Sequence, residues 1–469
     1  MRLAAALSLG LTGLLCLAPA FAEAPAVQRV EEGNRLTENV PPLPAELLEQ
    51  LERYQNTRPA SFAGWTPAGE LLITTRFGET NQVHRVATPL GMREQLSFHK
   101  EPVASVRAQP GASGFVFGKD VGGSEFWQLY HYDLETRGTR LLTDGGRSRN
   151  EQPLWSRDGQ QLAWTSTARN GRDSDIWLRR LDGEARAVLT EGGTWFATDF
   201  SPDGKRLLVQ QYVSINEGYP GELDLESGRL ERFPVDGGKA AFGPFRYAPD
   251  GEGVYFVSDE NSEFRRLRHH RPGQPVQVLS ADLDWDVVAF DIAADGGHLA
   301  YASNEDGIFR LHVLKLPEHT PVALPELPVG VITGLAFSPD GRRIGLGLNS
   351  ATSPSDVFVI DLDAARLTRW TQGEVGGLDA SRFVAPQLVR YESFDGLSIP
   401  AFYYRPAGVP ADRKLPVVIN IHGGPEAQAL PVFNASVQFM LEQLEVAVLV
   451  PNVRGSAGYG KTYVSLDNG

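Results

Sequence analysis

The sequence predicts an all-β, seven-bladed β-propeller followed by an incomplete, doubly wound α/β domain. Three observations lead to this prediction. A turn motif recurs seven times between residues 58 and 385, the hydrophobic pattern changes near residue 385, and two glycine-containing motifs follow the change. The predicted domains are therefore a signal peptide (1–22), an N-terminal segment with a short helix (23–57), the propeller (58–385) and part of an α/β domain (386–469).

The first residues are typical of an export signal. Arg2 supplies a positive charge, residues 3–17 are apolar, and Ala20-Phe21-Ala22 matches a small-x-small cleavage site. An uncleaved anchor helix is the alternative, although the apolar stretch is short for a bilayer. Cleavage would remove Cys16, the only cysteine of the chain, and with it any thiol ligand or disulfide. The expected location is periplasmic or extracellular.

Charge and composition limit the partners. The formal net charge is −14, and acidic and basic residues are interspersed. This pattern argues against a nucleic-acid partner and against an anionic membrane surface. We expect no membrane span after signal cleavage, no metal and no cofactor, and the sequence leaves homo-oligomerisation open.

A short helix precedes the repeats. Prolines at 41, 42 and 44 lead into residues Ala45–Tyr54, where Leu47, Leu48 and Leu51 fall with Tyr54 on one helical face.

The repeats are recognised by a turn of the Pro-Asp-Gly type. Asp-Gly between alternating hydrophobic residues indicates a hairpin, because glycine tolerates the positive φ of the turn. A period of about 45 residues with about four short strands is typical of a propeller blade. Six or eight blades are alternatives, since the first two repeats are degenerate. An elongated solenoid would also fit the repeats. The seven turns end in glycines 42 to 48 residues apart: Gly69, Gly111, Gly159, Gly204, Gly251, Gly296 and Gly341.

After residue 385 the pattern is that of an α/β sheet. Residues 388–406 resemble a hairpin, and Val417–Ile421 resembles a fully buried strand. Residues 435–444 form a predicted helix, and 446–450 a second buried strand. Nearly continuous apolar strands that alternate with helices favour a doubly wound sheet.

The first buried strand ends in His422-Gly423-Gly424-Pro425. Glycine lets backbone N–H groups approach a ligand without an intervening side chain. α/β-Hydrolases place one oxyanion-hole donor in such a loop. The N–H of Gly424 is the predicted donor, and a plain tight turn is the alternative.

The second buried strand leads into the motif Asn452-Val453-Arg454-Gly455-Ser456-Ala457-Gly458-Tyr459-Gly460. Together with the propeller repeats and the His422–Pro425 loop, it resembles the prolyl oligopeptidase family of serine peptidases, especially the acylaminoacyl-peptidase and dipeptidyl-peptidase-like branches. The resemblance implies an α/β-hydrolase domain that cleaves short peptides by acyl transfer, with the propeller restricting access. It also implies loop-fixing roles for Asn452, Arg454, Gly455 and Tyr459, with Arg454 in a buried ion pair.

The sequence departs from this family in one respect. The family's nucleophile lies on a G-x-S-x-G turn, and the 469 residues contain none. Gly111–Phe115 and Arg454–Gly458 each miss the pattern at one position. We therefore expect no catalytic Ser, Asp or His in this chain, place all three beyond Gly469, and expect the chain alone to be inactive. The alternative is a non-catalytic, TolB-like periplasmic propeller that binds partner proteins.

The propeller contains weaker candidates for a substrate-binding site and a metal site. The dipeptidyl-peptidase branch holds a substrate amino group with an acidic pair, and Asp259-Glu260 or Glu305-Asp306 could serve, although acids are common in loops. Exopeptidase and endopeptidase activity therefore both remain open. His269-His270 lies among arginines and is interpreted as part of an exposed strand and loop rather than a metal site.

The signal yields the first prediction. Cleavage after Ala22 should leave Glu23 at the mature N-terminus, because small residues at 20 and 22 fit the signal peptidase. The intact mass of exported protein measures this directly. A retained Met1, or a lipid on Cys16, would contradict it.

Overall fold

The computed structural model describes residues 27–424 and 426–467. The segment predicted as a signal peptide, residues 1–22, lies outside the described residues, so this prediction stays open. The chain divides into two compact units, residues 1–50 and 51–469.

The first unit contains a hairpin that the sequence analysis did not predict. Strand β1 (Arg29–Glu32) pairs antiparallel with β2 (Arg35–Glu38), and Gly33 at the turn has φ 61°. Helix α1 (Ala45–Gln55) covers the predicted helix and continues into the second unit.

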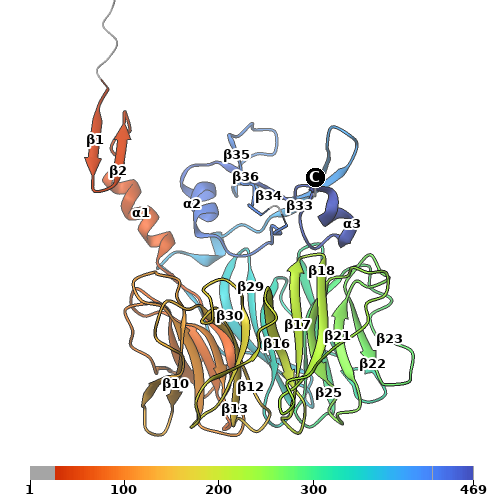
Figure 1. Cartoon of the computed structure of the whole chain (residues 1–469). Coiled ribbons are helices and arrows are strands. Elements are labelled where there is room, and N and C mark those ends of the chain that lie inside the picture. Colours follow the sequence, from red (N-terminus) through yellow and green to blue (C-terminus); the bar gives the residue numbers. More distant parts are fainter. Residues whose placement is uncertain (1–26, 425, 468–469) are drawn as a thin grey trace, which may run out of the picture. The chain divides into compact units, whose positions relative to one another are not determined.

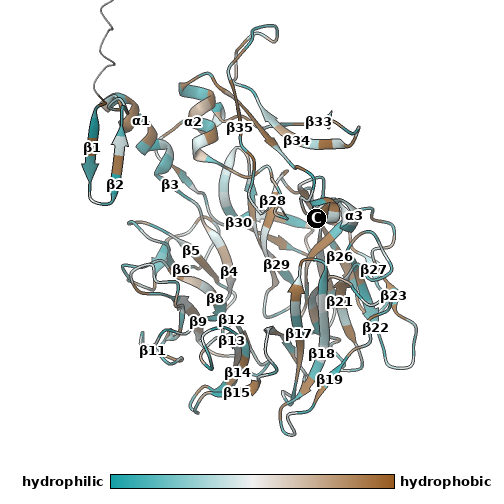
Figure 2. Ribbon diagram, turned by 45° about the horizontal axis from the view of Figure 1, so that its top comes forward, coloured by the Kyte–Doolittle hydropathy of each residue, from teal (hydrophilic) through white to brown (hydrophobic). Residues whose placement is uncertain are grey.

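The second unit contains seven four-stranded antiparallel sheets, each built from strands consecutive in sequence (Figure 1). Figure 2 shows hydrophobic residues along these strands and hydrophilic residues in many of the turns. The seven sheets, in order, are β4 (Ser61–Trp65), β5 (Leu71–Thr75), β6 (Gln82–Val86), β7 (Arg93–Gln95); β8 (Ala104–Ala108), β9 (Gly114–Lys119), β10 (Gln128–Asp133), β11 (Thr139–Leu141); β12 (Asn150–Trp155), β13 (Gln161–Ser166), β14 (Asp175–Arg180), β15 (Arg186–Leu189); β16 (Thr194–Phe200), β17 (Arg206–Ser214), β18 (Glu217–Asp224), β19 (Leu230–Arg232); β20 (Phe242–Tyr247), β21 (Val254–Ser258), β22 (Arg266–His270), β23 (Gln277–Val278); β24 (Asp286–Ile292), β25 (His298–Glu305), β26 (Ile308–Lys315), β27 (Thr320–Pro321); and β28 (Val331–Phe337), β29 (Arg343–Ser350), β30 (Ser353–Asp361), β31 (Arg366–Arg369).

The recurring turn has the same place in every sheet. It joins the first strand to the second, and the seven glycines have φ between 66° and 77°. An L-residue with a side chain is strained at such angles, which explains why glycine recurs there. The degenerate first and second repeats form the same four strands as the others.

The first strand of each sheet contacts the first strand of the next, and β28 of the seventh sheet contacts β4 of the first. At this closing junction the Trp65 ring packs edge-on against Trp370, with ring centroids 6.2 Å apart. Trp65 Nε1 donates to the Ala336 carbonyl oxygen at 3.1 Å, and the Arg343 guanidinium lies 4.8 Å above the Trp65 ring. A Cβ at Gly345 would lie 2.6 Å from Phe62 Cζ, so the junction requires glycine there.

A short ladder supports the same junction. Strand β3 (Thr57–Arg58) pairs with β32 (Glu374–Val375), and the Ala60 N–H donates to the Ser355 carbonyl at 2.7 Å. The segments just before and just after the seven sheets, β3 and β32, thus lie side by side. A 3-10 helix (Ala380–Arg382) follows.

The remaining strands form one mixed sheet in the order β33–β34–β36–β35. Strands β33 (Gln387–Glu392) and β34 (Ser398–Tyr404) make the predicted hairpin, and β35 (Val417–Ile419) runs parallel to β36 (Ala447–Pro451). Helix α2 (Ala435–Gln443) packs on β34 and β36 through Val437 and Leu441.

Within the described residues, the strand expected at 417–421 is not fully buried, because one of its edges has no neighbouring strand there. Val417, Val418 and Ile419 are 51%, 40% and 59% exposed. Strand β35 lies at the edge of the sheet, with β36 as its one partner within the described residues. An apolar sequence alone does not distinguish an edge strand from a central one.

The C-terminal sheet and helices lie over one end of the seven sheets (Figure 1). This end is formed by turns between the second and third strands. Phe433 N–H donates to Asn349 Oδ1 at 2.8 Å, and a Cβ at Gly307 would lie 2.9 Å from the Phe402 ring. Tyr54, in the last turn of α1, packs edge-on against Phe439 of α2 at 5.4 Å and accepts a hydrogen bond from Gln443 Nε2 at 3.1 Å.

Removal of the indole at the closing junction tests its importance. We expect Trp65→Ala to lower the free energy of unfolding by about 3–5 kcal/mol, because a large buried side chain leaves a cavity and an unpaired Ala336 carbonyl. Urea denaturation followed by circular dichroism measures the change. Met92→Ala is the control, since Met92 is 81% exposed. Equal midpoints for the two variants would show that the junction contributes little.

Candidate active site

The loop of His422, Gly423 and Gly424 follows the carboxyl end of β35, as predicted; Pro425 lies outside the described residues. Gly424 has φ 139°, and a Cβ there would lie 2.9 Å from the nitrogen of Glu426 and 3.0 Å from that of Ala427. A Cβ at Gly423 would meet nothing within 4 Å. Glycine at 424 is therefore required by the tight backbone, whereas Gly423 presents bare backbone to open space.

The second motif meets this loop. His422 Nε2 lies 2.8 Å from Ser456 Oγ, and Ser456 is completely buried. The Ala457 N–H is shared between the carbonyl oxygens of Glu426 and Ala427, each at 3.1 Å. Both motifs follow parallel strands, so they meet at the edge of the sheet where ligands bind in α/β folds.

Asn452 connects the two loops. Its Oδ1 accepts from the Ala429 N–H at 2.7 Å, and its Nδ2 donates to the Ala429 carbonyl at 3.1 Å and to the Tyr459 hydroxyl at 3.1 Å. The side chain is completely buried. Asn452 therefore pairs with both backbone groups of Ala429, as a residue of a neighbouring strand would, and so fixes the segment after the His422 loop.

The aromatic and charged residues of the second motif also fix loops. Tyr463 donates to the Asn452 carbonyl at 2.7 Å, and burial raises the pKa of Tyr463 to about 12. Burial, reinforced by nearby Asp306, raises the pKa of Tyr459 well above its usual value. Both phenols are thus neutral at physiological pH, and Tyr463 donates to Asn452 while Tyr459 accepts from it.

Arg454 forms an ion pair, but not a buried one. It binds both oxygens of Asp395 at 3.0 and 2.9 Å, and its guanidinium lies 5.2 Å above the Phe394 ring. The side chains of Arg454 and Asp395 are 28% and 41% exposed. The expected burial is wrong because the partner lies in the exposed turn between β33 and β34.

A propeller residue holds the segment that follows the second motif. Glu263 accepts from the Thr462 N–H and hydroxyl, each at 2.8 Å, at the start of helix α3 (Gly460–Val464). Its carbonyl accepts from the Lys461 N–H at 2.9 Å, and Lys461 Nζ donates to the Asp259 carbonyl at 3.2 Å. A short 3-10 helix (Ser465–Asp467) follows.

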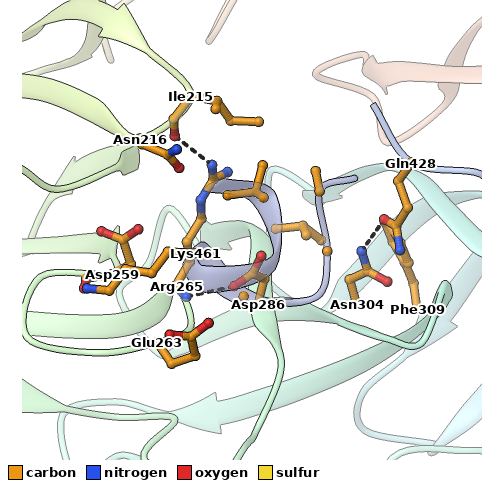
Figure 3. A pocket seen from close by; sticks show the side chains of 15 residues that line it. Ile215, Asn216, Asp259, Glu263, Arg265, Asp286, Asn304, Phe309, Gln428 and Lys461 are labelled. Carbon is orange, nitrogen blue, oxygen red and sulfur yellow. Dashed lines mark hydrogen bonds between the residues drawn. The ribbon is translucent and has the colours of Figure 1, made fainter. Parts of the chain in front are cut away.

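These contacts border a cavity of about 160 Å³ between the propeller turns and the second motif (Figure 3). Asp259, Glu263, Asp286, Arg265 and Lys461 line it. Burial raises the pKa of Asp259 and of Asp286. Figure 3 shows Arg265 bound to Asp286 through its backbone N–H and to the Ile215 carbonyl through its guanidinium, at 2.8 and 3.1 Å.

The structure separates both candidate acidic pairs. Asp259 lines this cavity, whereas the Glu260 carboxylate accepts from the Asp236 N–H at 2.6 Å. Glu305 binds Arg310 at 2.8 Å, and Asp306 binds Arg390 at 2.5 Å. Neither pair directs two carboxylates to one point.

The interpretation of His269 as exposed is wrong. It lies in β22, is 8% exposed, and stacks on Tyr255 with ring centroids 4.1 Å apart. Burial lowers the pKa of His269 to about 4. Residues 27–424 and 426–467 contain no group of three His, Cys, Asp or Glu side chains suited to a metal ion.

Several residues of the site were not predicted. Glu263, Asp395 and Lys461 become recognisable only through their partners in the folded chain. Ser456 had a signal in the sequence, because it lies inside the second motif. None of the helices in the described part of the chain has the length and apolar character to cross a membrane.

Comparison with known proteins finds similar chains. No family model matches the chain. The chain is 24% identical over 461 residues to the uncharacterised peptidase YuxL of Bacillus subtilis, covering 75% of this chain and 68% of that protein. It is 32% identical over 119 residues to prolyl oligopeptidase A of Galerina marginata, covering 25% of this chain and 16% of that protein.

A solved structure from a study of two prolyl endopeptidases superposes with a TM-score of 0.75 at 18% identity, covering 89% of this chain and 65% of that one. The chain therefore has the fold of prolyl oligopeptidases over about two thirds of their length. The resemblance to the prolyl oligopeptidase family that the two motifs predicted is confirmed.

Asn452→Ala tests the connection between the loops. We expect faster amide hydrogen exchange in residues 426–432, because the Ala429 N–H and carbonyl lose their partner. The expected cost is about 1–3 kcal/mol for each buried group left unpaired. Exchange followed by mass spectrometry measures the local effect. Asn170→Ala, in an exposed turn, is the matched control, and unchanged exchange at 426–432 would contradict the role of Asn452.

Proposed function

We propose that the chain forms the propeller and the first part of the α/β-hydrolase domain of an exported serine peptidase of the prolyl oligopeptidase family. Its substrates would be short peptides, and the propeller would restrict their access. The observation that carries this proposal is the meeting of the His422 loop and the Asn452–Gly460 motif at the carboxyl ends of β35 and β36. The peptidases among its relatives support peptide bonds as the target.

The loop chemistry fits acyl transfer. Backbone N–H groups at Gly423 and Gly424 would stabilise the oxyanion that forms when a serine attacks the peptide carbonyl. The family uses a serine activated by histidine. The 469 residues contain no G-x-S-x-G, so the proposal assigns the nucleophile, the acid and the base to sequence outside these residues. The chemistry requires no cofactor.

Two features support the architecture in this proposal. Seven four-stranded sheets with contact between β28 and β4 support a seven-bladed ring. The mixed sheet with parallel β35 and β36, covered by α2, supports the first part of an α/β-hydrolase domain. The relatives named above give no support to the alternative of a non-catalytic, TolB-like propeller.

A fluorophosphonate serine probe tests the function. The 469-residue chain alone should not react with the probe and should hydrolyse no chromogenic dipeptide ester. If the reading frame extends beyond residue 469, its longer product should react at one serine in a G-x-S-x-G turn. Stoichiometric labelling of the 469-residue chain, or no labelled serine in the longer product, would overturn the proposal.

Two glycine substitutions in the longer product test the loop. Gly424→Ala should lower kcat by about 10²–10³-fold, the usual effect of losing an oxyanion-hole donor. The added Cβ would collide with the Glu426 and Ala427 nitrogens and displace the loop. Gly423→Ala, which meets no neighbour within 4 Å, should have a much smaller effect. Equal effects would place the donor elsewhere.

A further inference from the structure

All seven junctions between neighbouring sheets are packed with buried hydrophobic side chains, but one junction contains fewer of them than the others. Each contains a cluster of buried hydrophobic side chains drawn from both sheets. Six of these clusters hold six to ten buried residues. The cluster between the fourth and fifth sheets holds four: Leu208, Phe245, Tyr247 and Phe256. This junction is therefore the least filled by the protein's own side chains.

The space left there is a cavity of about 500 Å³. Strands β18, β20 and β21 border it, with the segments after β19 and β22. It is larger than the cavity of about 160 Å³ beside the motif loops. Sites for small organic molecules have volumes of about 300–1,000 Å³.

The floor of the cavity is aromatic. The rings of Phe245 and Phe256 stack at 5.1 Å with an interplanar angle of 1°, and Phe242 tilts against them at 5.8 and 6.4 Å. Phe233 and Phe242 are half-buried and present ring surface to the cavity. Aromatic faces attract apolar groups and, through their quadrupole, cations.

The charges around the cavity are mostly negative. Four carboxylates line it, against one guanidinium and one imidazole: Glu222, Glu231, Asp236, Glu260, Arg206 and His270. Arg206 is bound by Glu222 at 3.1 Å, and Glu222 also accepts from the Tyr247 hydroxyl at 2.7 Å. Glu222 thus neutralises Arg206, and Glu231 binds Arg229 at 3.0 Å, so the negative charge of the rim comes from Asp236 and Glu260.

We propose that this cavity binds a small organic cation that carries an aromatic or bulky apolar group. The apolar group would contact Phe233 and Phe242, and the ammonium or guanidinium group would lie toward Asp236 and Glu260. The negative rim disfavours an anion of the same shape. The site is separate from the loops proposed for peptide hydrolysis.

Tryptamine and indole-3-propionate are matched probes, because they share an indole and differ in the sign of the charge. Calorimetric titration of the 469-residue chain should show tryptamine binding about tenfold or more tightly than indole-3-propionate. The difference should shrink at high salt, since the rim is exposed. Equal binding of both indoles would overturn the cation preference, and no tryptamine binding would overturn the site.

Two variants locate the binding. Phe242→Ala removes part of the floor and should abolish tryptamine binding. Asp236→Asn changes an exposed side chain, leaves the fold unaffected and should weaken binding several-fold. The matched controls are Phe126→Ala, in the connection between β9 and β10, and Asp182→Asn, whose side chain is 96% exposed; neither should change binding. If Asp236→Asn and Phe242→Ala, made separately, both bind tryptamine with wild-type affinity, the cation binds elsewhere and the proposal is overturned.

Discussion

Packing between the first and seventh sheets determines the arrangement of all seven. Each sheet is formed by its own consecutive strands, so no strand within the described residues belongs to two sheets. Hydrogen bonds cross the closing junction one by one rather than as a continuous ladder. They include the two residue pairs of β3 and β32, the bond from Ala60 and the bond from the Trp65 indole, and the Leu90 N–H, Arg93 and Arg343 also donate to the carbonyls of Trp370, Gln372 and Gly69. The buried cluster that includes Trp65 and Trp370 fills the junction between these bonds, and Gly345 leaves room for Phe62. The turns that face the C-terminal sheet keep their spacing only while this junction holds.

The candidate site depends on that spacing because it is built from both parts of the second unit. Glu263, in a turn of the fifth sheet, binds the first residues of α3, and Asn349, near the end of strand β29 in the seventh, binds the segment before α2. The His422 loop has weaker support, since it follows an edge strand whose side chains are half exposed. Ser456 and Asn452 compensate through buried hydrogen bonds to the loop and the segment after it. Hydrogen bonds among buried groups are stronger and more directional than exposed ones, which suits a loop that must hold a defined shape.

Features with a local cause could be predicted from the sequence. The seven turn glycines, α1, α2 and the hairpin of β33 and β34 follow from backbone preferences or short-range hydrophobic patterns. The two motifs of the site were found because their glycines and their order are distinctive. Features that depend on distant partners could not be predicted. The exposure of β35 is set by its position in the sheet, the burial of His269 by Tyr255, and the partner of Arg454 lies 59 residues earlier. Glu263 lies 199 residues before Thr462, and no sequence pattern joins the two.

The contact of Tyr54 with α2 affects the order in which the protein folds during synthesis. Tyr54 and Gln443 are 389 residues apart, and all seven sheets are encoded between them. At a rate of about 5–20 residues per second, the ribosome needs about 20–80 seconds to make that interval. During this time the sheets can form one after another as they emerge, whereas the last turn of α1 has not yet met its partner. The nascent chain therefore exposes the Tyr54 ring to water, without its partners on α2, until translation has passed α2.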